Sequence, residues 1–207
     1  MKLFSRKKSV EETPDDFWTQ RVKLEKIKSK YDYFTKICTG KNVIHFGCTD
    51  WPIFVPSTNL HIWLNDICEN LSGFDIDVEG IKDLKKHVDK DYYSEFHQLD
   101  GKQFDVCLVP ETIEHVQNIS SFLANIGKIS AKKIVITGPN CFAPDHMQRN
   151  SSNDTSFTEI VHPDHNCWFS PFTLKNVITK YANLNVDRVF LLEDETMVCC
   201  ECSAKDA

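Results

Sequence analysis

The sequence predicts an α/β protein built on a doubly wound, mostly parallel seven-stranded sheet with an antiparallel terminal strand. Short β-rich runs alternate with segments of helical spacing, and a pair of β-rich runs closes the chain. Strands that alternate with helices are typical of a parallel sheet with helices on both faces. The 207 residues suit one domain with a substantial hydrophobic core. We therefore expect a flexible tail over residues 1–14 and a single domain over residues 15–207.

The first half of the chain shows this alternation from its start. Pro14 and two aspartates open a segment of helical spacing that Gly40 closes, and the β-rich run NVIHF then ends at Gly47. Further apolar residues at helical spacing are separated by short β-rich runs. These patterns predict helices at residues 15–37, 59–69 and 78–88, and strands at residues 42–46, 71–74 and 94–98.

The second half contains the clearest strand, FDVCLV, which is followed by Pro110. Residues 138–171 are polar and show little periodicity, and a loop of this length in a compact domain is usually functional or mobile. The acidic residues 193–195 predict a hairpin turn. Together these patterns predict helices at residues 118–129 and 171–181, and strands at residues 104–109, 133–137, 185–192 and 196–202.

Charge and composition exclude several classes of protein. The net charge is −6, so the chain as a whole does not favour nucleic acid or anionic lipid. The basic residues 6–8 have no apolar segment behind them, and no apolar run is long enough to cross a bilayer. We expect a cytoplasmic protein with no nucleic-acid partner and no membrane insertion, and its oligomeric state stays open.

The nine cysteines are scattered and include no CxxC pair, which disfavours a thiolate zinc site. A chain without a secretion signal should keep its thiols reduced, and buried thiols pack as small hydrophobes. Cys199, Cys200 and Cys202 fall in an apolar run and are predicted to be strand residues.

Acidic residues follow several predicted strands, where an open α/β sheet binds its ligands. Gly47 follows the first strand, Asp75 and Asp77 the second, and Asp100 the third. Carboxylates accept hydrogen bonds from ribose hydroxyls or an adenine amino group, and glycine lets the backbone approach a ligand. Because GxxxxGK[ST] and GxGxxG are absent, the pattern favours a nucleoside-like ligand over a polyphosphate. The local alternative is that the aspartates cap a helix or form a turn.

These residues resemble those of the class I S-adenosylmethionine-dependent methyltransferases, in particular a small bacterial subgroup with an EH pair after the fourth strand. The resemblance spans residues 31–202 and rests on the segments NVIHFGCTDWP, GFDID, LDG, FDVCLVPETIEHV, KIVITGPN and DHNCWFSPFTLKNVITKYAN. It implies a Rossmann-like methyltransferase fold with S-adenosylmethionine as cofactor.

The resemblance also implies which residues bind the cofactor. Asp75 would hold the ribose, Ile76 would lie against the adenine face, and Asp100 would meet the adenine amino group. Gly47 and Cys48 would contact the methionine part. The complete implied set is Gly47, Cys48, Thr49, Asp75, Ile76, Asp100 and Pro110.

The sequence departs from the family at the first motif. Thr49 stands where the family usually has a second glycine, and Trp51 and Pro52 stand where a helix normally begins. The interval from Gly47 to Asp75 is also longer than usual. A catalytically degenerate module that binds the cofactor or supports a partner is therefore the alternative hypothesis.

The EH pair belongs to a larger group of candidate catalytic residues. Glu111, Glu114 and His115 would share one face of a helical turn, and His162 and His165 follow in the long loop. In one hypothesis His115 is a general base for a substrate hydroxyl and Glu114 orients its ring. In a structural alternative, the pair only caps and packs the turn.

A second catalytic hypothesis is a divalent metal. Glu111, Glu114, His115 and His165 would together hold Mg²⁺ or Mn²⁺ with positions left open for substrate. The pattern ExxEH with a distant DH resembles that of the small-RNA 2′-O-methyltransferases and the ubiquinone-pathway O-methyltransferases, both of which are metal-assisted.

The sequence therefore predicts a methyltransferase that acts on an oxygen of a small polar acceptor, such as a sugar or surface-glycan precursor. This acceptor class rests on the resemblance of GCTDWP and DHNCWFSP to small bacterial methyltransferases of that kind. Residues 138–171 would form the acceptor wall and lid. An oxidoreductase on the same fold is disfavoured, because Gly47 stands alone rather than in a dinucleotide-binding motif.

Overall fold

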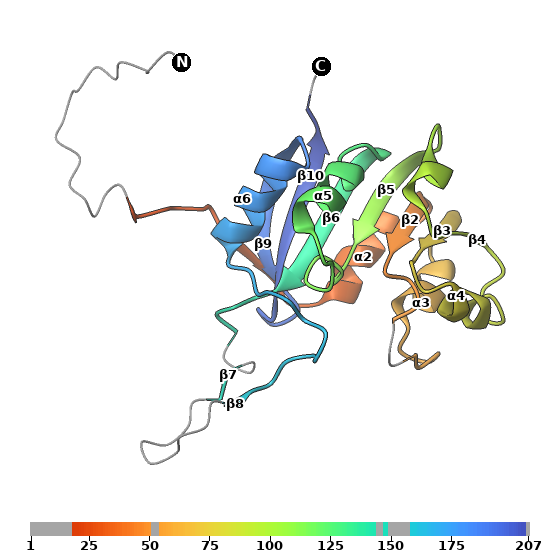
Figure 1. The fold of residues 1–207 in the computed structure, drawn as a ribbon, viewed down its shortest axis with the longest axis horizontal. Coiled ribbons are helices and arrows are strands. Elements are labelled where there is room, and N and C mark those ends of the chain that lie inside the picture. The colour runs from red at the N-terminus through yellow and green to blue at the C-terminus, as the bar shows by residue number, and fades with distance from the viewer. Residues whose placement is uncertain (1–17, 51–53, 144–146, 149–157, 206–207) are drawn as a thin grey trace.

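The computed structural model describes residues 18–50, 54–143, 147–148 and 158–205. Its centre is an eight-stranded sheet of order β1-β9-β10-β6-β5-β2-β3-β4 (Figure 1). In that order the strands are β1 (Glu25–Ile27), β9 (Leu184–Leu192), β10 (Met197–Ala204), β6 (Ser130–Pro139), β5 (Gln103–Val109), β2 (Asn42–Phe46), β3 (Asn70–Phe74) and β4 (Asp91–Tyr93). Of these strands, only β10 is antiparallel to its neighbours. The predicted mostly parallel sheet with an antiparallel terminal strand is confirmed, with β1 as an additional strand at its edge.

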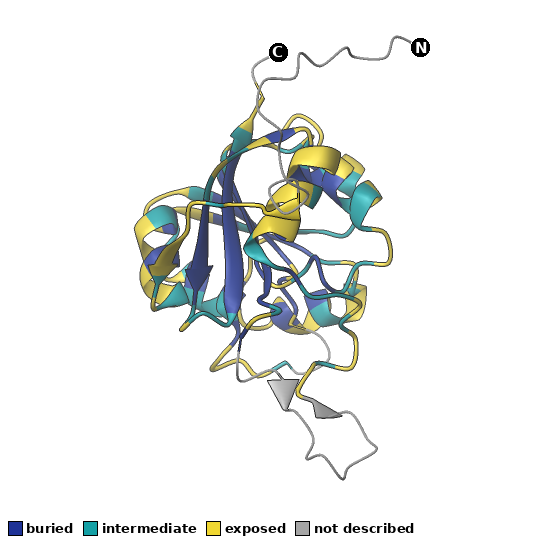
Figure 2. Ribbon diagram, turned by 90° about the vertical axis from the view of Figure 1, so that its left-hand side faces the viewer, coloured by how far each residue is buried: buried dark blue, intermediate teal, exposed yellow. Residues whose placement is uncertain are grey.

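Helices cover both faces of the sheet, as a doubly wound fold requires. One hydrophobic cluster joins α5 and α6 to the sheet, and a second joins α2 and α3 to the opposite face. Figure 2 shows the buried residues concentrated on the strands between helices with exposed outer faces. The helices are α2 (Lys30–Cys38), α3 (Leu60–Asn65), α4 (Val78–Leu84), α5 (Ile119–Ile126), α6 (Pro171–Tyr181) and the 3₁₀ helix η1 (Phe96–Leu99).

The position of β5 inside the sheet, between β6 and β2, explains why its sequence is almost continuously apolar. Val106 and Leu108 pack in the α2/α3 cluster, whereas Cys107 and Val109 pack in the α5/α6 cluster. Successive strand residues point to opposite faces, so a strand covered on both sides needs apolar residues at every position. Both faces of β10 are buried in the same way, which places Cys199 and Cys200 in opposite clusters.

Two predicted elements were wrong. The helix expected over residues 15–37 begins only at Lys30, where Ser29 accepts the N–H of Asp32, and residues 25–27 instead pair with β9. Edge pairing there overrides the helical spacing of the apolar residues. The strand expected at residues 94–98 is the helix η1, because Glu95 and Gln98 form a capping box, and the strand lies earlier at β4.

The late part of the chain follows the prediction more closely. Helix α6 has the predicted bounds, with Ser170 as N-cap and proline in its first turn. Residues 193–195 form the predicted turn between β9 and β10, and all three have positive φ. The long segment after Gly138 is not entirely irregular, because β7 (Met147–Gln148) pairs with β8 (Thr158–Glu159) away from the body of the domain (Figure 1).

The expected tail over residues 1–14 lies outside the described residues. Within the described part of the chain, no helix combines the length and apolar character needed to cross a membrane.

Candidate active site at the carboxyl edge of the sheet

The candidate site lies where the carboxyl ends of β2, β3 and β5 meet. Strand β2 pairs in parallel with β3 on one side and with β5 on the other. The chain runs outward from β2 to β3 and β4 and then returns to β5, so the strand order reverses beside β2. Such a switch point is where open α/β sheets bind ligands. Gly47, Asp75 and Pro110 follow these three strands, as expected.

Gly47 begins a tight loop, residues 47–50, which we call the Gly47 loop. It has φ +70°, and its N–H donates to the carbonyl of Phe74 at 2.9 Å. A Cβ atom here would lie 2.7 Å from the Thr112 hydroxyl oxygen. Both the positive φ and the close approach therefore require glycine. Gly47 is exposed, whereas Cys48 is fully buried, so Gly47 and not Cys48 faces the surface of the loop.

Asp75 ties the Gly47 loop to the end of β3. One carboxylate oxygen, Oδ2, accepts hydrogen bonds from the backbone N–H of Thr49 at 3.0 Å and from its hydroxyl at 2.8 Å. The other oxygen, Oδ1, accepts from the N–H of Asp77 at 3.0 Å. Thr49 stands at the position where the methyltransferases that this sequence resembles usually have a second glycine, and it is a buried structural partner of Asp75.

The alternative that these aspartates cap a helix is not what the geometry shows. Asp77 is the N-cap residue of α4, but its side chain makes no capping hydrogen bond within the described chain. A carboxylate has about four acceptor positions, so three accepted hydrogen bonds leave Asp75 about one for a ligand. Asp75 is therefore both a loop anchor and a candidate ligand contact.

The other expected nucleoside contacts are placed unevenly. Ile76 is 83% exposed beside Asp75, which leaves an apolar side chain bare at the strand edge. Pro110 is buried at the end of β5. Asp100 lies apart, as the C-cap of η1 in the turn that leads into the amino end of β5. Ser94 and Glu95 directly follow β4 at the carboxyl edge. They were not identified from the sequence because the strand was predicted at residues 94–98.

The turn after β5 separates the three residues of the ExxEH motif. Glu111 has φ +42°, its N–H donates to the Thr137 hydroxyl at 3.0 Å, and its carboxylate lies 3.4 Å from the ammonium of Lys30. Glu114 points inward and is fully buried. Because the backbone leaves helical geometry at Glu111, the expectation that Glu111, Glu114 and His115 share one helical face was wrong.

Glu114 is an unusual buried acid. Neither of its carboxylate oxygens has a hydrogen-bond partner among the described residues. Oε1 lies 3.9 Å from Nε2 of His165. Burial raises the pKa of Glu114 to about 8, since the charged form is poorly solvated there. A buried carboxyl without partners is costly, which makes it a candidate functional group.

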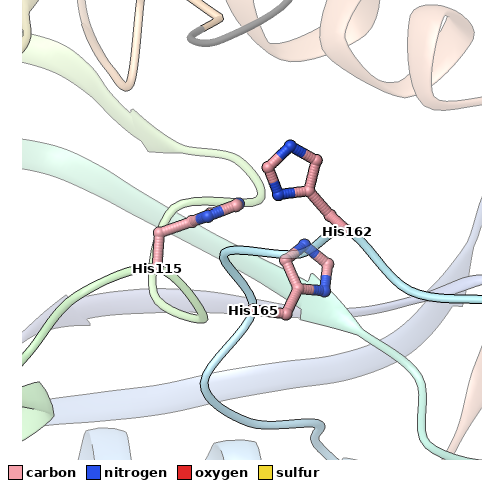
Figure 3. Close-up of side chains that lie close together, drawn as sticks. All are labelled: His115, His162 and His165. Carbon is pink, nitrogen blue, oxygen red and sulfur yellow. The ribbon is translucent and has the colours of Figure 1, made fainter.

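Three histidines gather beside this acid. We call His115, His162 and His165 the histidine cluster, in which one ring nitrogen of each lies within 4.8 Å of the others. Figure 3 shows the three rings converging from the turn after β5 and from the late loop, residues 160–170. Nδ1 of His115 is 3.0 Å from a carboxylate oxygen of Asp164. Asp164, rather than Glu114, is therefore the carboxylate that orients the His115 ring.

The late loop is fastened to the turn that carries His115. The N–H of Asn166 donates to the Glu114 carbonyl at 2.8 Å, and its side-chain amide donates to the His115 carbonyl at 3.2 Å. The backbone N–H of Asp164 also reaches Nδ1 of His162 at 3.2 Å. These contacts hold residues about fifty positions apart in one arrangement. The sequence signal for these contacts was the HPDH run at residues 162–165. The resemblance to known motifs assigned no role to His162 or Asp164.

The Gly47 loop and the histidine cluster adjoin through Thr112. Its hydroxyl lies against Gly47 and donates to the Pro110 carbonyl at 2.8 Å, and its carbonyl accepts the N–H of His115 at 3.1 Å. A ligand on the loop would therefore lie beside the cluster. The arrangement brings the candidate nucleoside contacts Gly47 and Asp75 beside imidazole and carboxyl groups, which can move protons or hold a metal.

The fold is shared with S-adenosylmethionine-dependent methyltransferases of known structure. A putative type 11 methyltransferase from Sulfolobus solfataricus aligns with TM-score 0.63 and 12% identity, over 87% of this chain and 94% of that one. The N-methyltransferase NodS from Bradyrhizobium japonicum, in complex with S-adenosyl-L-homocysteine, aligns with TM-score 0.54 and 12% identity, over 84% and 82%. A chain of the Pnkp1/Rnl/Hen1 RNA repair complex aligns with TM-score 0.57 and 12% identity, over 84% of this chain and 40% of that one.

No family model matches the sequence. No curated protein matches it either. At 12% identity the structural likeness establishes the class I methyltransferase fold, and the chemistry has to be argued from the site itself.

Proposed function

We propose that the protein transfers a methyl group from S-adenosylmethionine to a hydroxyl oxygen of a small polar acceptor, such as a sugar or surface-glycan precursor. The observation that carries this proposal is the contact between His115 and Asp164 beside the Gly47 loop. This contact supports a role for an oriented imidazole next to the position that we propose for the sulfonium methyl of a cofactor on that loop. The bound S-adenosyl-L-homocysteine of the structural neighbour NodS supports the choice of cofactor.

The cofactor would lie along the carboxyl edge of β2 and β3. The exposed Gly47 would face its methionine part, and the remaining acceptor position of Asp75 would take a ribose hydroxyl. We do not extend this contact to Cys48, which is fully buried. The exposed Ile76 would cover the adenine face. Thr49 holds Asp75 in place through two hydrogen bonds, and Pro110, buried at the end of β5, would border the cofactor. We do not extend this proposal to Asp100, because the structure places it at the other end of β5.

His115 would act as the general base in the metal-free reaction. In the tautomer protonated at Nδ1, the Nδ1–H group donates a hydrogen bond to Asp164, so Nε2 keeps a lone pair for the acceptor hydroxyl. The acceptor oxygen attacks the methyl carbon, the carbon–sulfur bond breaks, and the hydroxyl proton passes to Nε2. The products are a methyl ether, S-adenosylhomocysteine and protonated His115. Because this is an in-line displacement, the alignment of the two reactants supplies most of the rate enhancement.

A divalent metal is the second candidate role for the same side chains. The buried Glu114 carboxyl has no hydrogen-bond partner in the described chain, and a bound cation would give its oxygens a partner. Of the four ligands expected from the sequence for Mg²⁺ or Mn²⁺, Glu114, His115 and His165 lie together, whereas Glu111 contacts Lys30. A metal held there would lower the pKa of an acceptor hydroxyl and orient it.

Cofactor binding and methyl transfer should be measured separately. Calorimetry with S-adenosylmethionine tests binding, and transfer of a labelled methyl group to sugars, glycan precursors and RNA oligonucleotides tests the acceptor. We expect binding and labelling of a sugar-type hydroxyl. Labelling of RNA instead would overturn the acceptor class, and absence of cofactor binding would favour the degenerate module. Activity that persists in a chelator supports the base role, whereas activity lost with chelator and restored by metal supports the metal role.

A further inference from the structure

We infer that His115, His162 and His165, together with Glu114, form a binding site for a borderline transition-metal ion of the Zn²⁺ type rather than for Mg²⁺, and that Glu111 is not a ligand. This inference rests on the metal role of the proposed function and names the ion and its ligands.

The distances within the histidine cluster suit a first-row ion. The candidate nitrogens lie within 4.8 Å of one another, and the rings face a common space (Figure 3). Tetrahedral Zn²⁺ has Zn–N distances of about 2.0–2.1 Å, so its nitrogens are about 3.3 Å apart. Ion binding would therefore require side-chain rotations that shorten the longest of these distances by up to about 1.5 Å. All three histidines are partly exposed, which gives an ion a path from solvent.

Glu114 supplies an independent reason for a cation at this place. Its carboxyl is fully buried, and its two oxygens have no hydrogen-bond partner among the described residues. Oε1 lies 3.9 Å from Nε2 of His165, so the acid borders the histidine cluster. Buried polar groups in folded proteins are almost always satisfied by hydrogen bonds, water or a metal. A cation between Glu114 and the rings would satisfy this one.

The groups around the cluster match those that support metal-bound histidines. A metal-ligating imidazole usually donates its other N–H to a carboxylate or carbonyl, which fixes the ring and raises its basicity. His115 has that arrangement with Asp164 at 3.0 Å. Asn166 fixes the backbone at Glu114 and His115, so the ligands from the two segments cannot drift apart independently.

Glu111 is held away from the cluster by its own backbone and partners. Its φ of +42° turns the chain, Thr137 holds its N–H, and Lys30 contacts its carboxylate. The donor set is then three imidazoles and one carboxylate. Imidazole nitrogen suits Zn²⁺, Fe²⁺ and related ions, whereas Mg²⁺ prefers oxygen ligands and water. With an ion on Nε2, His115 is a ligand, and the base role of the metal-free form does not operate.

Metal binding to the untagged, full-length protein, freed of metal by chelator, tests this directly. Co²⁺ serves as a visible probe for a Zn²⁺ site, and calorimetry measures Zn²⁺ and Mg²⁺. We expect one Co²⁺ per chain with visible absorption bands, displacement by Zn²⁺, and a rise in melting temperature that Mg²⁺ does not reproduce. His162→Asn and Glu114→Gln should each weaken Zn²⁺ binding by about tenfold or more, and Glu111→Gln should leave it unchanged.

Three results would overturn the inference: no Zn²⁺ binding, equal preference for Mg²⁺, or a loss in Glu111→Gln as large as in His162→Asn. The triple variant His115→Asn/His162→Asn/His165→Asn keeps all nine cysteines, so ion binding that persists in it would also reject the site. Circular dichroism confirms that each variant is folded. Since none of these measurements needs cofactor or acceptor, a failed methyl-transfer assay does not affect them.

Discussion

Asp75 and Thr49 are joined by two hydrogen bonds, one from the Thr49 backbone N–H at 3.0 Å and one from its hydroxyl at 2.8 Å. This contact links the Gly47 loop after β2 to the residue that follows β3. A glycine at position 49 would leave Asp75 without the hydroxyl, so the Thr49 side chain is one of the contacts that fix the shape of this loop. The departure at position 49 is therefore part of a built contact, which argues against a decayed motif.

Replacing Thr49 by valine should destabilise the protein and weaken cofactor binding. The variant keeps the shape of the side chain but removes a hydrogen bond to a charged group, which typically contributes about 1.5–3 kcal/mol. Urea unfolding should show a loss in this range. Thr49→Ser retains the hydroxyl and is the matched control. Equal losses in the serine and valine variants would show that the hydroxyl is not the cause.

Replacing Asp75 by alanine should abolish measurable S-adenosylmethionine binding. The substitution removes both the proposed ribose contact and the anchor of the Gly47 loop. Asp77→Ala is the control, because its side chain makes no capping hydrogen bond in the described chain. Calorimetry measures both. Tight binding by Asp75→Ala, or the same loss in Asp77→Ala, would rule out the specific role of Asp75.

His115→Gln should keep cofactor binding and lose turnover. In the metal-free reaction His115 is the general base, and such groups contribute roughly 10²–10⁴-fold to rate, so kcat measured in a chelator should fall by that order. Asp164→Asn should reduce kcat by a smaller factor, because it leaves the imidazole in place but removes its partner at 3.0 Å. The exposed His97→Gln is a matched control. Full turnover in His115→Gln would reject the catalytic role.

The fold was largely predictable because local signals and burial agree. Helix α6 begins where Ser170 and Pro171 give both a cap and a fixed φ, and its predicted bounds match the structure. Strand β1 was not predictable. It has three residues, and its pairing with β9 is supported by an ion pair between Glu25 and Arg188 from distant parts of the chain.

The site was predictable in its location but not in its contacts. Residues at the strand ends were identified because parallel strands present their carboxyl ends at one edge. The partner of Asp75 lies 26 residues away, and the partner of His115 lies 49 residues away. Neither separation has a periodic signature. The positive φ of Glu111 also broke the helical turn on which the ExxEH grouping depended.

A second histidine pair should make stability depend on pH. His45 in β2 is buried, and its Nδ1 lies 3.2 Å from Nδ1 of the equally buried His61 in α3. Burial lowers the pKa of His45 well below its usual value, and that of His61 to about 3. The ring of Tyr92 packs against His61 at 5.3 Å between centroids. A protonated imidazole would be poorly solvated among these buried rings.

Because both folded-state pKa values are lowered, the unfolded chain binds more protons than the native protein as pH falls below about 6.5. The stabilisation is fully present above that pH and is lost toward acid, by about 1.4 kcal/mol per histidine and pH unit. Glu114 acts in the opposite direction, since its raised pKa of about 8 makes the native state bind the extra proton above its ordinary value of 4.5. The wild type must therefore be compared with a variant that keeps Glu114, so that the contribution of Glu114 to the pH dependence cancels.

The double variant His45→Leu/His61→Leu provides that comparison. Between pH 6.5 and 5, the free energy of unfolding of the wild type should change more steeply than that of the variant, by roughly 2 kcal/mol per pH unit on average for the two histidines together. The exposed pair His87→Gln/His97→Gln should show the wild-type slope. Urea unfolding at each pH measures all three proteins. If the double variant does not fold, His61→Leu alone should remove about half of the difference. Parallel slopes for wild type and variant would mean that the pair titrates normally despite its burial.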